Sequence, residues 1–176
     1  MGHQLHHDTT KFELKKFPIV LICDQVNSPA NIGSLFRIAD SFGISQIYFC
    51  GEDITVVSKR MLRTARSTHH HVAHQHKEEI TEVITSLKED GYSIVALEIT
   101  EDSIACSDYD MNSEQKIALI IGEENHGVSE AALKLSDQTV HIDMYGNNSS
   151  MNVAVATGIA LYEITNQLLP SARLDR

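Results

Sequence analysis

The chain has 176 residues, of which 42% are hydrophobic and 22% charged, values typical of one globular domain with a sizeable core. Its formal net charge of −10 argues against non-specific nucleic-acid binding, which depends on lysine and arginine neutralising phosphates. No apolar run is long enough to cross a membrane, and no secretory signal opens the chain. The three scattered cysteines predict reduced thiols. We therefore expect a cytoplasmic protein without membrane contact.

The N-terminal part begins with a polar segment, 1–16, which we expect to be flexible and whose histidines are either native or a cloning remnant. The run "PIVLICD" (18–24) predicts a buried strand because it is rich in β-branched and aliphatic residues. A helix is expected next, with Ser28 as its cap, Pro29 in its first turn and Gly43 just after its end. The apolar residues that repeat at helical spacing on its buried face are Ile32, Leu35, Phe36, Ala39 and Phe42.

Two residues of this helix need a separate explanation. Gly33 precedes Arg37 by one helical turn, so no side chain lies beneath the stem of the arginine and a notch opens there. The spacing predicts that something outside the helix fills this notch.

The middle of the chain continues the alternation of strands and helices. We expect a strand at 46–50, an amphipathic helix at 77–91, a strand at 92–99 and a polar loop at 100–115. The one concentrated basic stretch, "SKRMLRTAR", follows the first of these strands and contains Lys59, Arg60, Arg63 and Arg66. Its spacing is equally consistent with a nucleic-acid patch and with a solvated helix face.

The last third is denser in expected elements. A strand at 116–122 leads into the loop "EENHGVSE", followed by a short helix and a strand at 138–143. The loop "MYGNNSS" then precedes a long apolar helix, "MNVAVATGIALYEITNQLL", which Pro170 ends. Strands alternating with helices predict an α/β fold whose mostly parallel sheet carries helices on both faces.

The loops that follow strands are the expected place for a ligand, because ligands of open α/β sheets bind beyond the carboxyl ends of the strands. Loops with glycine and small polar residues follow Ile99, Ile121 and Asp143, whereas the first loop lacks G-x-G-x-x-G and no P-loop is present. A nucleotide-like ligand is therefore expected at the C-terminal loops. Taken singly, these loops also have simple structural explanations, such as a helix cap at Ser149 or Ser150.

Three motifs occur in order along the chain. The first two, N-x-G-x-x-x-R and G-x-E-x-x-G after a strand, are formed by Asn31, Gly33 and Arg37 and by Gly122, Glu124 and Gly127. The third, I-P-M-x-G leading to S-L-N-V, is approached by "IDMYGNNSSMNV", where Asp143 replaces the usual proline, Met151 the usual leucine and Ala154 a frequent serine. Together, over roughly residues 17 to 169, they resemble the motifs of the SpoU/TrmH-type SPOUT RNA methyltransferases.

This resemblance implies S-adenosylmethionine as methyl donor, a ribose 2′-hydroxyl of tRNA or rRNA as acceptor, and a C-terminal trefoil knot. It places the methyltransferase domain at 17–170, followed by a tail at 171–176. It also implies that the cofactor lies among the C-terminal loops, at positions matched by Leu97, Gly122, Ile142, Met144, Gly146 and Met151. Gly122 would let the main chain come close where a Cβ would intrude.

Arg37 matches the arginine to which the family assigns catalysis, and Gly33 would leave room beside it for the RNA backbone. Because arginine stays protonated, its expected role is to bind a phosphate or the ribose oxygen and to stabilise the developing alkoxide. The residues expected to hold Arg37 and shape the site are Asn31, Glu124, Ser150 and Asn152.

The last helix is apolar nearly all round, which predicts burial on several sides. The resemblance accordingly implies a homodimer through this helix, with an active site that borrows from both copies. Two alternatives stay open: a homologue that holds RNA or cofactor without turnover, and a histidine-rich metal-binding protein. In the segment His69–His76, His70 or His71 would lie one helical turn from His74, which is adequate for a metal, but no cysteine accompanies them and the family needs no metal. The target RNA and nucleotide are not defined by the sequence.

Overall fold

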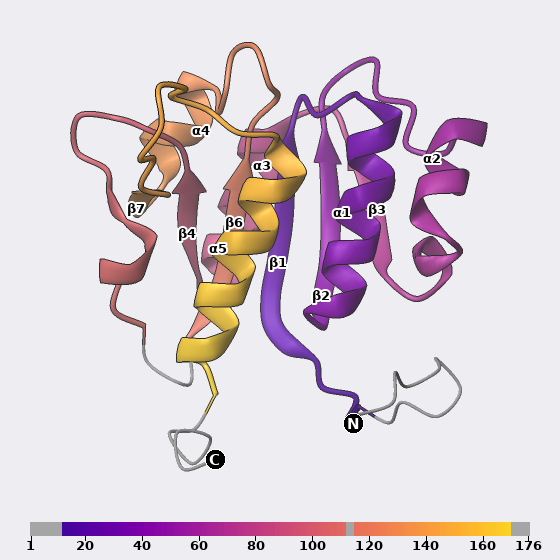
Figure 1. Ribbon diagram of the computed structural model, residues 1–176, viewed down its shortest axis with the longest axis horizontal. Helices are drawn as coiled ribbons and strands as arrows, with labels where there is room; N and C mark the ends of the chain where they lie inside the picture. The colour runs from indigo at the N-terminus through magenta and orange to yellow at the C-terminus, as the bar shows by residue number, and fades with distance from the viewer. Residues whose placement is uncertain (1–11, 112–114, 170–176) are drawn as a thin grey trace.

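The sheet is the organising element of the computed structural model, which describes residues 12–111 and 115–169. Its seven strands lie in the order β3-β2-β1-β6-β4-β7-β5, and each neighbouring pair is parallel (Figure 1). The strands are β1 (Phe17–Asp24), β2 (Ile44–Cys50), β3 (Ala73–Lys77), β4 (Tyr92–Leu97), β5 (Ile104–Ala105), β6 (Lys116–Ile121) and β7 (Gln138–His141). The prediction of a mostly parallel α/β sheet is confirmed.

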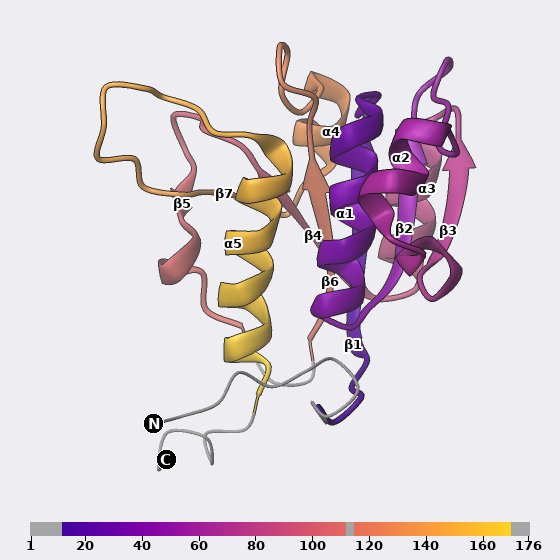
Figure 2. The ribbon, with the colours of Figure 1, turned by 45° about the vertical axis from the view of Figure 1, so that its right-hand side comes forward.

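Helices cover both faces of the sheet, as expected. The helices are α1 (Pro29–Ser41), α2 (Lys59–Ala65), α3 (Ile80–Glu89), α4 (Glu130–Leu135) and α5 (Val153–Gln167), with 3-10 turns η1 (Thr68–His70) and η2 (Cys106–Asp108). Helices α1, α2 and α5 lie on one face, and α3 and α4 lie on the other (Figures 1 and 2).

The central strand β1 shows why the sheet is covered twice. Its side chains alternate, so that Ile19 and Leu21 join the apolar cluster beneath α1 and α5, while Val20 and Ile22 join the cluster beneath α3. A strand buried on both faces reads as a continuous apolar run, which is the pattern that predicted it.

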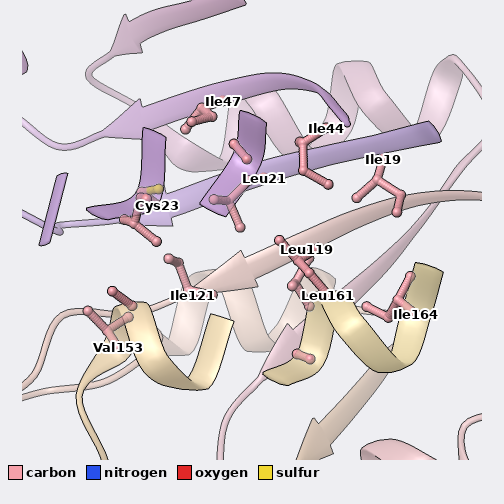
Figure 3. Packing of buried hydrophobic residues seen from close by; sticks show 14 of the residues in the cluster. Ile19, Leu21, Cys23, Ile44, Ile47, Leu119, Ile121, Val153, Leu161 and Ile164 are labelled. Atoms are coloured by element: carbon pink, nitrogen blue, oxygen red, sulfur yellow. The ribbon is translucent and has the colours of Figure 1, made fainter. Parts of the chain in front are cut away.

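Helix α5 covers the middle of the sheet beside α1. Its Leu161 and Ile164 pack over the strands near Leu119 (Figure 3), and its Gly158 lies against Ile38 of α1. The chain therefore returns from β7, which lies next to the edge strand β5, to the middle of the sheet before it forms α5. No helix within the described ranges is long and apolar enough to cross a membrane.

The histidine-rich segment differs from the sequence-based expectation. It forms the turn η1 and the edge strand β3, so the helical spacing expected between His70 or His71 and His74 is wrong. The strand was missed because it pairs with β2 through its backbone while most of its side chains are exposed. Within residues 12–111 and 115–169, no group of three or more His, Cys, Asp or Glu side chains is placed to hold a metal ion.

Smaller differences concern loops and helix ends. The expected polar loop at 100–115 contains β5 and η2. Ser28 is the N-cap residue of α1, but its side chain makes no capping hydrogen bond. Helix α5 is capped by Asn152 and not by Ser149 or Ser150. Pro170, the tail at 171–176 and most of the expected N-terminal segment (1–11) lie outside the described residues.

The three cysteines are buried and free, as expected. Burial, with a smaller contribution from nearby carboxylates, raises the pKa of Cys50 to about 12 and that of Cys106 to about 11. Both side chains therefore remain thiols at neutral pH.

Candidate active site

The loops after β4, β6 and β7 meet at the carboxyl edge of the sheet and enclose a pocket of about 500 Å³. Among the described residues that line it are the expected cofactor positions Leu97, Gly122, Ile142, Met144 and Met151. Gly146 is not among the lining residues, and a Cβ built on it meets nothing within 4 Å. The expected cofactor positions other than Gly146 therefore line one pocket, and their role in binding a cofactor stays a prediction.

The pocket combines apolar and acidic walls. Its lining residues include the apolar Ile121 and Val153 and the acidic Glu98, Glu123 and Glu124. Such a surface suits a ligand that has a flat apolar part and a positive charge.

A relay of three side chains connects this wall to α1 and α5. The Asn152 Oδ1 caps α5 by accepting hydrogen bonds from Ala154 N (3.0 Å) and Val155 N (3.3 Å). Its Nδ2 therefore points outward and donates to Asn31 Oδ1 at 3.0 Å, and Asn31 Nδ2 in turn donates to Glu124 Oε1. The capping bond fixes the orientation of both amides, so the carboxylate of Glu124 is held in one position.

Gly122 is required by the loop itself. A Cβ on Gly122 would lie 2.0 Å from the carbonyl carbon of Gly127 and 2.3 Å from Val128 N. The backbone that approaches Gly122 closely is therefore that of the same loop, and a close approach of Gly122 to a ligand stays a prediction.

Glu98 was not singled out from the sequence, yet it joins two of the loops. Its Oε1 accepts a hydrogen bond from Ile99 N at 2.8 Å, and its Oε2 accepts one from Val128 N at 3.0 Å. The carboxylate also lies against Gly127, where a Cβ would come within 2.1 Å of it. The sequence signal that was available is an acidic residue directly after a buried strand.

The turn after β6 is held by Glu123. Burial alone would raise the pKa of this carboxyl, but hydrogen bonds from His126 and Asn125 outweigh burial and lower it. Glu123 is therefore ionised at neutral pH and pins the turn that carries Glu124.

Arg37 lies apart from this relay. Arg37 is exposed and does not line the pocket, and its side chain makes no hydrogen bond or ion pair with any residue that the structure describes. It lies six positions after Asn31, which is a shift of about 9 Å along the helix and roughly 240° around it. The expectation that Asn31, Glu124, Ser150 and Asn152 hold Arg37 is therefore wrong within one chain. Ser150 does line the pocket, but it is exposed and takes no part in the relay.

The notch at Gly33 is filled by the protein itself. A Cβ on Gly33 would lie 2.6 Å from Thr64 Cβ and 2.7 Å from the carbonyl oxygen of Met61, both in α2. Something outside the helix does fill the notch, as predicted, but it is α2. The expectation that Gly33 leaves room for an RNA backbone is wrong.

Comparisons with known proteins agree with this architecture. The model of the SpoU rRNA Methylase family matches residues 18–162. An "Uncharacterized tRNA/rRNA methyltransferase" of Borreliella burgdorferi is 31% identical over 157 residues, which are 89% of this chain and 68% of that protein. A "Putative TrmH family tRNA/rRNA methyltransferase" of Staphylococcus saprophyticus is 28% identical over 113 residues, which are 64% of this chain and 44% of that protein.

Two solved structures share the fold. The A. aeolicus TrmH/SpoU tRNA modifying enzyme superposes with a TM-score of 0.78 at 26% identity and covers 88% of this chain and 77% of its own. The SpoU methyltransferase AviRb of Streptomyces viridochromogenes, in complex with AdoMet, superposes with a TM-score of 0.77 at 27% identity, covering 92% of this chain and 64% of its own. Several matched relatives are thus considerably longer than the region shared with this chain.

Proposed function

Because the chain belongs to the SpoU rRNA methylase family, we propose that it transfers a methyl group from S-adenosylmethionine to a ribose 2′-hydroxyl of tRNA or rRNA. The observation that carries the proposal is the pocket at the carboxyl edge of the sheet, with Glu124 held in its wall by Asn31 and Asn152. The AviRb structure contains AdoMet, which supports this choice of donor.

The residues of the pocket fit S-adenosylmethionine, which supplies an electrophilic methyl group on a sulfonium when bound. The pocket volume of about 500 Å³ lies in the range of roughly 300–1,000 Å³ that is usual for small-molecule sites. Leu97, Ile142 and Met151 offer an apolar slot for adenine. Glu98 and Glu124 add negative charge to the pocket lining, which suits a cationic ligand.

We assign the acceptor side of the reaction to Arg37. Its guanidinium binds a phosphate or the ribose oxygen of the RNA and stabilises the alkoxide as it develops. Because Arg37 points away from the relay of its own chain, this role requires a second copy of the protein, whose pocket receives it.

An exposed apolar stripe on α5 supports such a homodimer. Val155, Ile159 and Tyr162 lie at helical spacing and are 54%, 43% and 61% exposed. An apolar stripe of this kind is stabilised when a second surface covers it. Since α1 packs beside α5, pairing through this stripe brings Arg37 of each copy to the interface.

The topology belongs to the same proposal. We propose that residues 142–152 thread through a loop of the chain to form a C-terminal trefoil knot before α5 begins. Tracing that crossing in an experimental structure tests it, and an unthreaded path would refute it.

Calorimetry with S-adenosylmethionine, and with NAD as the control, is the direct test of the pocket. We expect binding of the first and none of the second; absence of S-adenosylmethionine binding at millimolar concentration would overturn the proposal. Incorporation of labelled methyl groups into bulk tRNA and rRNA from a deletion strain, followed by nucleoside mass spectrometry, tests the acceptor. Cofactor binding without any methyl incorporation would favour the catalytically silent alternative.

Arg37 has its own test. We expect Arg37→Ala and Arg37→Lys to lower methyl transfer by about 10²–10³, because a lost oxyanion donor has this effect and lysine lacks the planar fork of arginine. Affinity for S-adenosylmethionine should stay within a few-fold, since Arg37 does not line the pocket. Wild-type turnover of the alanine variant would remove Arg37 from the mechanism.

A further inference from the structure

The exposed side of α2 carries a group of cations that the pocket and the relay do not use. They are Lys59, Arg60 and Arg63 of α2 and Arg66 at its C-cap, all exposed. None of them forms an ion pair with a residue that the structure describes, although the protein has ten more acidic than basic side chains. The nearest acidic residues in sequence, Glu52 and Asp53, form no ion pair with this helix either.

These cations share one side of the helix. At 3.6 residues per turn, Lys59, Arg60 and Arg63 lie within about 100° of one another. The opposite side carries Met61 and Ala65, which are fully buried in the core beneath α1. The orientation of α2 is therefore fixed by packing, and its basic side is presented to solvent.

Local helix energetics do not explain this charge. Lys59 and Arg60 occupy the first turn of α2, where the helix dipole favours negative charge and disfavours cations. No acidic residue is present in that turn to compensate. Two positive charges thus stand at a position where they weaken the helix slightly, which points to a role outside the folded chain.

The position of α2 relative to Arg37 suggests what that role is. Gly33 brings α2 into direct contact with α1, and Arg37 lies one turn further along the same side of α1. Ile38, the next residue, faces Gly158 of α5. Arg37 is therefore exposed on the side of α1 that lies between its contacts with α2 and α5. Figure 2 shows α1 between these two helices.

We propose that the basic side of α2 binds phosphates of the RNA strand that flank the methylated nucleotide, and so guides the target ribose to Arg37. This inference rests on the proposed function, whose acceptor is RNA. The ligand chemistry is a row of phosphodiesters, which lysine and arginine bind through charge and counterion release. In an otherwise acidic protein, a local patch of this kind restricts RNA binding to one face.

The test compares two double variants that remove the same charge. Lys59→Gln/Arg60→Gln changes the first turn of α2, and Lys88→Gln/Lys134→Gln changes α3 and α4 on the opposite face, where both lysines already pair with carboxylates. Binding of fluorescently labelled bulk tRNA is measured from low to high salt. Each lost phosphate contact should reduce the slope of the logarithm of affinity against the logarithm of salt concentration by about 0.9. This corresponds to roughly a fivefold loss of affinity per contact at about 0.15 M salt.

Two further measurements test the alternative that Lys59 and Arg60 have only a structural role. The Lys59→Gln/Arg60→Gln variant should unfold at the same or a higher urea concentration than wild type, because the helix dipole is relieved, and its affinity for S-adenosylmethionine should not change. In methyl transfer, KM for RNA should rise while kcat is largely kept. Loss of affinity for RNA without loss of stability supports the proposal.

The outcomes separate this inference from the function on which it rests. If wild type methylates RNA but the α2 variant binds tRNA as tightly as the α3/α4 control, the α2 surface is not the RNA site and the proposed function stands. If wild type binds no RNA at any salt concentration, both are overturned. An α2 variant that loses a protein partner instead of RNA would also overturn the inference.

Discussion

Gly33 lies where α1 and α2 touch, and its replacement by alanine measures how firmly α2 is held. The added Cβ would lie 2.6 Å from Thr64 Cβ and 2.7 Å from Met61 O. Ordinary contact begins at 3.4 Å, so the backbone of α2 must retreat by about 0.7 Å from its carbonyl contact alone. Because α2 is packed into the core through Met61, this retreat disturbs the cluster beneath α1.

The magnitude follows from two opposing effects. Overpacking of this size typically costs about 1–3 kcal/mol. Alanine is a better helix former than glycine by about 0.5–1 kcal/mol, which offsets part of the loss. We therefore expect Gly33→Ala to lower the free energy of unfolding by about 1 kcal/mol in net terms.

Gly158→Ala provides the matched control, because it is the same change inside a helix without the steric conflict. A Cβ on Gly158 meets only Ile38 Cδ1, at an ordinary 3.9 Å. This variant should gain about 0.5–1 kcal/mol, so the difference between the two variants isolates the steric effect at about 1–3 kcal/mol. The assay is urea unfolding at equal protein concentration. Equal midpoints for the two variants would refute the reasoning, since α2 would then shift without loss.

Two further predictions concern hydrogen bonds outside that contact. Asn152→Asp keeps an acceptor for Ala154 N and Val155 N but cannot donate to Asn31, so the free energy of unfolding should stay within about 0.5 kcal/mol of wild type while methyl transfer falls. Asn152→Ala removes both the helix cap and the hydrogen bond to Asn31. This variant should lose methyl transfer and about 1 kcal/mol of unfolding free energy, measured with urea. Burial raises the pKa of Asp137, but hydrogen bonds from Ile94 N and Lys88 outweigh burial and lower the pKa. This carboxylate therefore stabilises the fold at pH values above the pKa that it has in the unfolded chain. The stabilisation is lost as the pH falls through the lower pKa of the folded state. Asp137→Asn should accordingly lower the free energy of unfolding at pH 7, measured with urea, by about 0.5–1 kcal/mol for this half-exposed pair. In strong acid the variant should match wild type, and a constant difference at all pH values would contradict this assignment.

The elements that could be predicted from the sequence are those whose side chains carry the pattern. Strand β1 is apolar up to Cys23 because both of its faces are covered, and α1 repeats its apolar residues at helical spacing. Strand β3 was missed because its stability comes from backbone pairing with β2, which leaves no apolar alternation in "AHQHK". The capping role of Asn152 was missed for a related reason: serine and asparagine are equally good caps, and only the geometry selects between them.

The candidate site was predictable in composition but not in arrangement. The resemblance of the motifs to the SpoU/TrmH-type family implied that Asn31, Glu124 and Asn152 lie together, and the structure joins them in one relay. The same resemblance grouped Arg37 with them, although Arg37 lies six positions after Asn31 and therefore on another side of α1. The notch at Gly33 was also predicted correctly as a gap. The sequence alone does not distinguish a glycine that admits a neighbouring helix from one that admits a ligand.

The separation of Arg37 from the relay of its own chain leads to a complementation experiment. If Arg37 acts in the pocket of the partner copy, a heterodimer of Arg37→Ala and Glu124→Ala contains one site with an intact pocket and an intact arginine and one site that lacks both. Each variant alone should be nearly inactive, whereas the heterodimer, purified through two different tags, should recover about half of the wild-type rate because one of its two symmetric sites is complete. If Arg37 instead acts within its own chain, each site of the heterodimer keeps one defect and no activity returns. A mass of twice 19.6 kDa in light scattering establishes that the mixed species is the dimer, and a heterodimer no more active than its parents would refute the shared site.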